Sequence, residues 1–127
     1  MNDPRTLALA TIEAEEQLIG AILIDASTGS KEGVNTARAT LTPADFRQTI
    51  HQQIFSAMLA CTEAPHQINT ARQMAAQGTL AGDVVAHMSH CISVTGGLDY
   101  EAYAQAVKEY SQRRGGAPPS RVRGLQL

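Results

Sequence analysis

Residues 41–59 read LTPADFRQTIHQQIFSAML, and this stretch decides the fold. Its start is typical of a helix N-terminus: Thr42 can cap, Pro43 has the φ angle of a first helical residue, and Asp45 brings a carboxylate to the free amide groups. Apolar residues then recur four apart, some with an apolar neighbour, and so form one stripe along a helix. They are Phe46, Ile50, Ile54, Phe55, Met58 and Leu59. Because both phenylalanines of the chain lie here, we predict a helix over 42–60 at the centre of the core.

The composition favours a single helical domain. The chain has 127 residues, enough for one core but not for two. Aromatic residues make up 4%, Trp is absent, alanine is abundant and β-branched runs are scarce, which together favour helices over a sheet. The net charge of −2 is unlike that of a protein that binds nucleic acid by electrostatic attraction, so we expect no direct nucleic-acid binding.

The chain has the features of a cytoplasmic protein. No apolar run approaches the ~20 residues that span a bilayer, and acidic residues stand where a secretion signal would have a basic start. Two cysteines, Cys61 and Cys91, do not make a disulfide framework and are expected to be reduced thiols. We therefore expect a cytoplasmic location and no membrane partner.

Further helices are predicted on both sides of the central one. The expected parts are a flexible arm at 1–10, helices over 11–25, 34–39 and 69–77, a helical hairpin over 83–114, and a disordered tail at 115–127. The hairpin is expected because two amphipathic helices follow each other with about six residues between them. The predicted fold class is all-α, a compact globule of five to six helices that ends in this hairpin.

The first predicted helix contains acidic residues and a glycine that need an explanation. Glu13, Glu15 and Glu16 crowd the first turn after Thr11, where we interpret them as partners of the helix dipole and not as an acid/base pair. Gly20 costs a helix roughly 1 kcal/mol relative to Ala, so we expect another helix to approach closely there. The predicted core consists of Leu18, Gly20, Ile22, Phe46, His51, Ile54, Phe55 and Met58.

Four blocks of the sequence resemble the N-terminal domain of bacterial replicative DNA helicases of the DnaB type. They follow one another in the right order over about residues 11–114. The residues that carry the resemblance are Glu13, Ala14, Glu15, Gly20, Ala21, Ile22 and Leu23; Leu41, Pro43, Asp45, Phe46, His51, Ile54, Phe55, Ala57, Met58 and Leu59; Ile68, Asn69, Met74, Gly78 and Leu80; and Tyr103, Ala104, Val107, Lys108, Glu109, Tyr110, Arg113 and Arg114.

The resemblance implies a module that assembles with other proteins. In that family the C-terminal hairpins pair two domains into dimers, which form a collar above the motor ring and contact primase. The chain has no G-x-x-x-x-G-K-[ST] phosphate loop, and so it lacks the backbone amides and the lysine that hold nucleotide phosphates. We therefore predict a non-catalytic module, without catalytic residues or cofactor, that associates with itself as a homodimer or higher oligomer, or with helicase or primase.

An apolar stripe on the predicted hairpin is our expected interface. An apolar face that its own domain leaves uncovered marks an interaction site, and tyrosine suits such a face because it adds contact area and keeps a polar end. The predicted interface residues are Val84, Met88, Tyr100, Tyr103, Val107 and Tyr110. The alternative is that the tyrosine face packs back on the core of its own domain.

A metal-binding regulator is the second hypothesis. His87, His90 and Cys91 form H-x-x-H-C on a predicted helix, and two imidazoles one turn apart can share a metal ion, with Cys61 and His66 as further ligands. The simpler interpretation, which our prediction adopts, assigns no metal, places both histidines on the helix surface and uses Cys91 as a small apolar side chain.

Two further features have simple structural interpretations. We expect His51 to make a structural hydrogen bond near the core, because no nucleophile or carboxylate partner for catalysis is indicated. A third hypothesis, a small DNA-binding protein, depends on Arg113, Arg114, Arg121 and Arg123. A solvated tail explains these arginines more simply.

Overall fold

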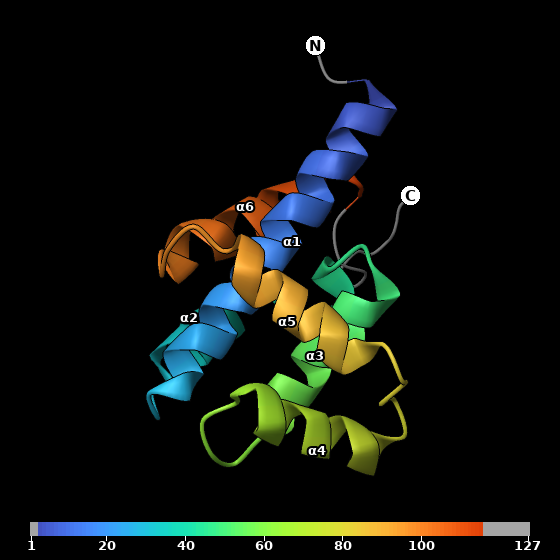
Figure 1. The fold of residues 1–127 in the computed structure, drawn as a ribbon. Helices are drawn as coiled ribbons and strands as arrows, with labels where there is room; N and C mark the ends of the chain where they lie inside the picture. Colours follow the sequence, from blue (N-terminus) through green and yellow to red (C-terminus); the bar gives the residue numbers. More distant parts are fainter. Residues whose placement is uncertain (1–2, 116–127) are drawn as a thin grey trace.

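The computed structural model describes residues 3–115 of the chain. Within them the fold is all-α, as predicted, with six α-helices, one short 3-10 helix and no strand. In chain order the elements are α1 (Pro4–Ser27), α2 (Glu32–Thr40), the 3-10 helix η1 (Pro43–Asp45), α3 (Thr49–Ala60), α4 (Gln67–Gln77), α5 (Val84–Val94) and α6 (Tyr100–Arg113) (Figure 1). The predicted tail, apart from Gly115, lies outside the described residues.

Helix α1 begins at Pro4, well before the expected start at residue 11. Residues 4–10 are helical, where the sequence analysis predicted a flexible arm. The Asp3 side chain starts the helix, because its Oδ1 accepts hydrogen bonds from the amide groups of Arg5 and Thr6, both at 2.9 Å. No acidic residue lies in the first turn, so the three glutamates are inside the helix and the interpretation as dipole partners is wrong.

The predicted central helix is divided in two. The turn that begins at Thr42 ends at Asp45, and α3 begins only at Thr49. The helix is interrupted because the amide groups of Arg47 and Gln48 donate to a carboxylate of α1 and not to carbonyls of their own segment. A contact with a distant part of the chain therefore overrides the local preference for one continuous helix.

The apolar stripe forms the core in spite of this break. Phe46 lies between the two elements in extended backbone, yet its ring packs on Phe55 with the ring centroids 4.9 Å apart. All eight residues that were assigned to the core are buried. The spacing of the apolar residues thus predicted which side chains are buried, but not where the helix is interrupted.

The ends of the later helices follow local sequence signals. Gly78 closes α4 in the left-handed region, at a φ of 76°, and Asp99 caps α6, both as predicted. The start of α4 differs, because His66 is the cap and not Asn69: the His66 Nδ1 accepts a hydrogen bond from the Asn69 amide at 3.2 Å.

Helix α1 runs through the middle of the molecule between α5 and α6 (Figure 1). Helix α5 packs against α1 and α4, whereas α6 packs against α1, α2 and η1. The expected hairpin is therefore wrong in its packing: α5 and α6 are consecutive, but within the described residues they do not pack along each other. The close approach expected at Gly20 is confirmed, since a Cβ atom there would collide with the Thr95 hydroxyl and the Cys91 carbonyl at the end of α5.

None of the helices within residues 3–115 is both long enough and apolar enough to cross a bilayer.

Candidate functional site

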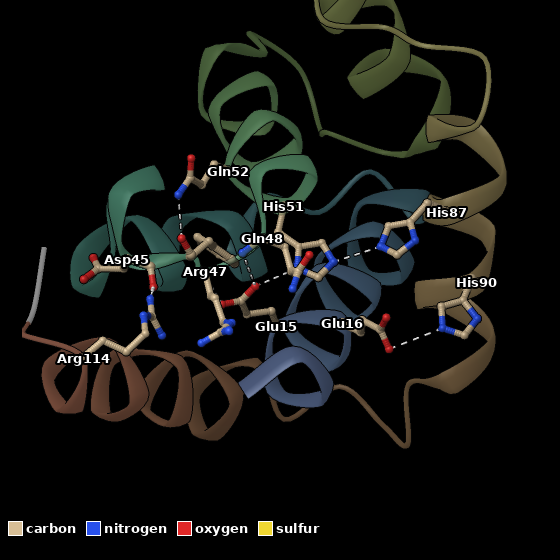
Figure 2. Close-up of polar contacts among 11 residues, drawn as sticks. Glu15, Glu16, Asp45, Arg47, Gln48, His51, Gln52, His87, His90 and Arg114 are labelled. Atoms are coloured by element: carbon tan, nitrogen blue, oxygen red, sulfur yellow. Dashed lines mark hydrogen bonds and ion pairs between the residues drawn. The ribbon is translucent and has the colours of Figure 1, made fainter. Parts of the chain in front are cut away.

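A buried carboxylate on α1 joins three parts of the chain. Glu15 has 0% exposure, and its Oε2 accepts a hydrogen bond from the Arg47 amide at 2.6 Å. Its Oε1 accepts one from the Gln48 amide at 3.3 Å and lies 2.7 Å from Nδ1 of His51 on α3 (Figure 2). An unpaired buried carboxylate is very costly, so these three N–H partners are what makes its position possible. The carboxylate fixes the junction between η1 and α3 against α1.

Glu15 is not among the predicted site residues, although the sequence carries a signal for its burial. Thr11, Glu15, Leu18 and Ile22 follow one another at steps of three and four, and all four are buried. An acidic residue on the apolar stripe of a helix predicts a buried partner. The assumption that the helix began at residue 11 hid this signal, because it placed Glu15 in an exposed first turn.

The hydrogen-bond chain continues from His51 to α5. His51 is 1% exposed, and its Nε2 lies 2.9 Å from Nε2 of His87, with the two rings stacked (Figure 2). Because a carboxylate can only accept, Nδ1 of His51 donates to Glu15 as its third N–H partner. Between the two Nε2 atoms, one nitrogen donates to the other and so links α3 to α5.

The protonation of His87 is set by its surroundings. Burial lowers the pKa of this half-buried imidazole below its usual value of 6.5, and the nearby His51 lowers it further. Both effects favour the uncharged form of the His87 ring.

The structure rearranges the predicted metal-ligand set. His90 points to α1, where its Nε2 lies 3.3 Å from the Glu16 carboxylate (Figure 2). Among the described residues, the potential ligand atoms that come together are those of His51, His87 and Cys91, all within 4.8 Å of one another. Neither His90 nor the suggested Cys61 and His66 belong to this group.

A second buried carboxylate anchors α6. Asp45 has 0% exposure, and its Oδ1 accepts a hydrogen bond from the Ser111 hydroxyl at 2.7 Å and lies 3.4 Å from the Lys108 ammonium group. Its Oδ2 accepts one from the Thr42 amide at 2.8 Å. The carboxylate therefore closes the η1 turn and attaches the far end of the chain to it.

Arg113, the last residue of α6, and Arg114, which caps it, contact their own domain. The Arg114 guanidinium donates from Nη2 to the Asp45 carbonyl at 2.8 Å, and its burial lowers its pKa. The Arg113 guanidinium lies 5.4 Å from the centre of the Tyr110 ring. These contacts weaken the DNA-binding hypothesis for both residues, whereas Arg121 and Arg123 lie outside the described part of the chain.

The predicted interface residues divide into two groups. Val84, Met88 and Val107 are buried in the chain's own core, with 2%, 0% and 1% exposure. Of the tyrosines, Tyr100 and Tyr103 pack against the same core, as the alternative interpretation expects. Tyr100, Tyr103 and Tyr110 are half-buried. The Tyr100 hydroxyl donates to the Glu32 carboxylate at 2.9 Å, which raises the pKa of Tyr100 to about 12.

Comparisons with known proteins place this geometry in a family. A family model described as the DnaB-like helicase N terminal domain matches residues 8–109. The chain belongs to this family. Its fold is similar to the crystal structure of the N-terminal domain of DnaB helicase from Mycobacterium tuberculosis, with 22% sequence identity and a TM-score of 0.70, over 81% of this chain and 74% of that one. No curated protein matches the chain.

The family assignment indicates which domain of a DnaB-like helicase this chain corresponds to. The match is to the N-terminal domain of DnaB-like helicases, and that domain is not the motor domain. The buried carboxylates of this DnaB-like domain accordingly have structural partners in the hydrogen bonds described above: Glu15 joins α1 to α3, and Asp45 joins η1 to α6.

The DnaB-like domain has an apolar surface that the sequence analysis missed. Ile68, Leu80 and Val85 have 61%, 41% and 44% exposure and line one shallow hollow between α4 and α5, which we call the α4–α5 patch. Large apolar side chains grouped on a surface mark an interaction site more often than scattered ones do. The sequence gives only a weak signal for this surface. Val84 and Val85 are adjacent and identical in type, so the sequence alone does not show that Val84 is buried and Val85 is exposed.

Proposed function

We propose that this chain is a non-catalytic protein–protein interaction and oligomerisation module of DNA replication. Its partners are further copies of itself, a replicative helicase of the DnaB type, or primase, and its location is the cytoplasm. The observation that carries the proposal is the family match over residues 8–109, which covers nearly all of the described helices. A copy of this domain could join a helicase collar or block one.

Two surfaces support association. The tyrosine face, made of Tyr100, Tyr103 and Tyr110, offers half-buried rings with polar ends. The α4–α5 patch offers larger exposed fractions of purely apolar side chains. Since Val84, Met88 and Val107 are buried, the interface that we propose no longer includes them.

Light scattering on the purified chain tests self-association. We expect the molar mass to rise with concentration above that of the monomer. A monomer at all concentrations would contradict the homo-oligomer but not the pairing with helicase or primase.

Mixing experiments test the other partners. The chain is combined with the helicase and the primase of its own organism, and co-elution and the rate of DNA unwinding are measured. We expect co-elution with at least one of them and a changed unwinding rate. If neither partner co-elutes, the unwinding rate stays the same and the chain is monomeric, the proposed function is wrong.

Charged substitutions distinguish the two surfaces. Val85→Asp places a carboxylate in the α4–α5 patch, and Tyr103→Asp places one in the tyrosine face. Ala86→Asp is the matched control, because Ala86 is exposed on α5 next to Val85. The surface whose variant loses association at least tenfold, by about 1.4 kcal/mol, is the interface. Equal binding by both variants and the control would exclude both surfaces.

A further inference from the structure

Three potential metal ligands from two helices meet beside α1. His51 comes from α3, and His87 and Cys91 lie one turn apart on α5. The two Nε2 atoms are 2.9 Å apart, and all three ligand atoms lie within 4.8 Å of one another. His51 and Cys91 are 1% and 0% exposed, whereas His87 is half-buried and offers a way in from solvent.

The tautomer of His51 suits metal binding. Its Nδ1–H donates to the Glu15 carboxylate at 2.7 Å, so Nε2 is the ring nitrogen that a metal ion would ligate, and it faces His87. A carboxylate behind a ligating imidazole fixes the orientation of the ring and raises its basicity. Here that carboxylate is itself held by the amides of Arg47 and Gln48, so His51 has little freedom to turn away.

The position of Cys91 is also held. Its backbone lies against Gly20 of α1, where a Cβ would collide with the Cys91 carbonyl. The Glu15 carboxylate behind His51 offsets part of the charge of a bound cation.

We propose that His51, His87 and Cys91 bind a divalent cation that favours nitrogen and sulfur ligands, zinc above all, with Glu15 positioning His51. Two imidazoles and a thiolate are typical zinc ligands, whereas magnesium and calcium prefer oxygen. A fourth ligand, water, reaches the ion on the side of His87. This site is independent of the association function and replaces the set His87, His90 and Cys91 that the sequence suggested.

Binding requires the thiol to draw closer to the two imidazoles. Bonds of about 2.3 Å to sulfur and 2.0–2.1 Å to nitrogen place the two kinds of ligand atom roughly 3.6 Å apart in a tetrahedron, and because the three atoms now lie within 4.8 Å of one another, the Cys91 side chain turns toward the histidines. Zinc–nitrogen bonds of about 2.0–2.1 Å in a tetrahedron separate two ligating nitrogens by roughly 3.3 Å, so the His87 ring moves away from His51 by a few tenths of an ångström. On binding, Cys91 loses its thiol proton to solvent, and His87 ligates through Nε2 with its one remaining proton on Nδ1. The ion then takes the place of the hydrogen bond between the two histidines.

Titration of the whole reduced chain with Co²⁺ tests the proposal, because the visible absorption of Co²⁺ reports tetrahedral geometry and a bond to thiolate. We expect one Co²⁺ per chain, a charge-transfer band from the thiolate, and displacement of the Co²⁺ by Zn²⁺. We also expect Zn²⁺ to raise the melting temperature.

Matched variants identify the ligands. His87→Ala and Cys91→Ala are expected to weaken Co²⁺ binding by at least about 100-fold, and Glu15→Gln by about 10–100-fold. His90→Ala on the same helix and Cys61→Ala, which removes the other thiol, should bind as the wild type does. Circular dichroism checks that each variant is folded. If Cys91→Ala does not fold, the His87→Ala variant tests the site on its own. Because the His87 side chain is only half-buried, its removal is expected to leave the fold intact.

Three results would overturn the site. The first is a wild-type chain that shows no saturable Co²⁺ absorption. The second is a His87→Ala variant that binds Co²⁺ with wild-type affinity. The third is a thiolate band that survives in Cys91→Ala and disappears in Cys61→Ala, which would place binding elsewhere.

Discussion

Glu15 connects α1 to the segment after η1 and to α3 through three hydrogen bonds. Replacing it with Ala leaves His51 Nδ1 and the amides of Arg47 and Gln48 without their acceptor. We expect Glu15→Ala to lower the free energy of unfolding by about 3–5 kcal/mol, because each buried donor without a partner costs on the order of 1–3 kcal/mol. Glu15→Gln keeps one oxygen and should cost less. Urea denaturation measures both.

Glu13→Ala is the control for this experiment. It removes a carboxylate from the same helix two residues away, but Glu13 is exposed. Its effect should stay within about 0.5 kcal/mol, as is usual for surface substitutions. Equal losses in the Glu13 and Glu15 variants would mean that the Glu15 contacts contribute nothing to stability.

The sequence predicted which apolar residues are buried, because a stripe at helical spacing depends only on local geometry. It did not predict the partners of the buried polar groups. Glu15 and His51 are 36 positions apart in the chain, and His87 is a further 36 away. Such pairs depend on how the helices cross in space, and the spacing of residues within one helix does not predict that crossing. The same limit explains why the ligand set that we propose contains His51 in place of His90.

At the scale of elements, Gly20 decides how closely α5 approaches α1. Gly20→Ala has two opposed effects: alanine favours the helix by roughly 1 kcal/mol, whereas its Cβ collides with the Cys91 carbonyl. A backbone atom cannot turn aside as a flexible side chain can, so we expect the collision to dominate, with a net loss of about 1–3 kcal/mol. Thermal and urea unfolding measure the loss.

Gly82→Ala is the matched control, since a Cβ there meets no atom within 4 Å. It should leave the free energy of unfolding within about 0.5 kcal/mol of the wild-type value. A Gly20→Ala variant as stable as this control would show that α5 moves away from α1 easily.

Element types were predictable where caps and breakers act locally, as Gly78 and Asp99 do. Element bounds failed where a distant partner intervened. The helix expected over 42–60 is broken because the amides of Arg47 and Gln48 donate to α1. The expected hairpin fails for a similar reason: α5 and α6 are neighbours in sequence, but each finds more surface to bury against α1 than against the other.

At the scale of the whole molecule, α1 has two very different halves. Every residue from Leu18 to Leu23 is buried, whereas none from Pro4 to Ala10 is. Helical hydrogen bonds between residues 4 and 10 open with little loss of packing, because none of these residues is fully buried, but those at 18–23 open only when α5 and α6 leave. We expect amides at 18–23 to exchange hydrogen only through global unfolding and those at 7–10 to exchange faster by orders of magnitude.

Native-state hydrogen exchange at two protein concentrations tests this expectation and connects it to association. The first half of α1 carries Leu9 with 59% exposure, so a second copy that covered it would slow exchange at 7–10 as concentration rises. If the amides at 7–10 exchange slowly at every concentration, this part of α1 is more stable than its packing within a single chain explains. If exchange at 18–23 is fast, α1 is not the central helix that its position between α5 and α6 makes it.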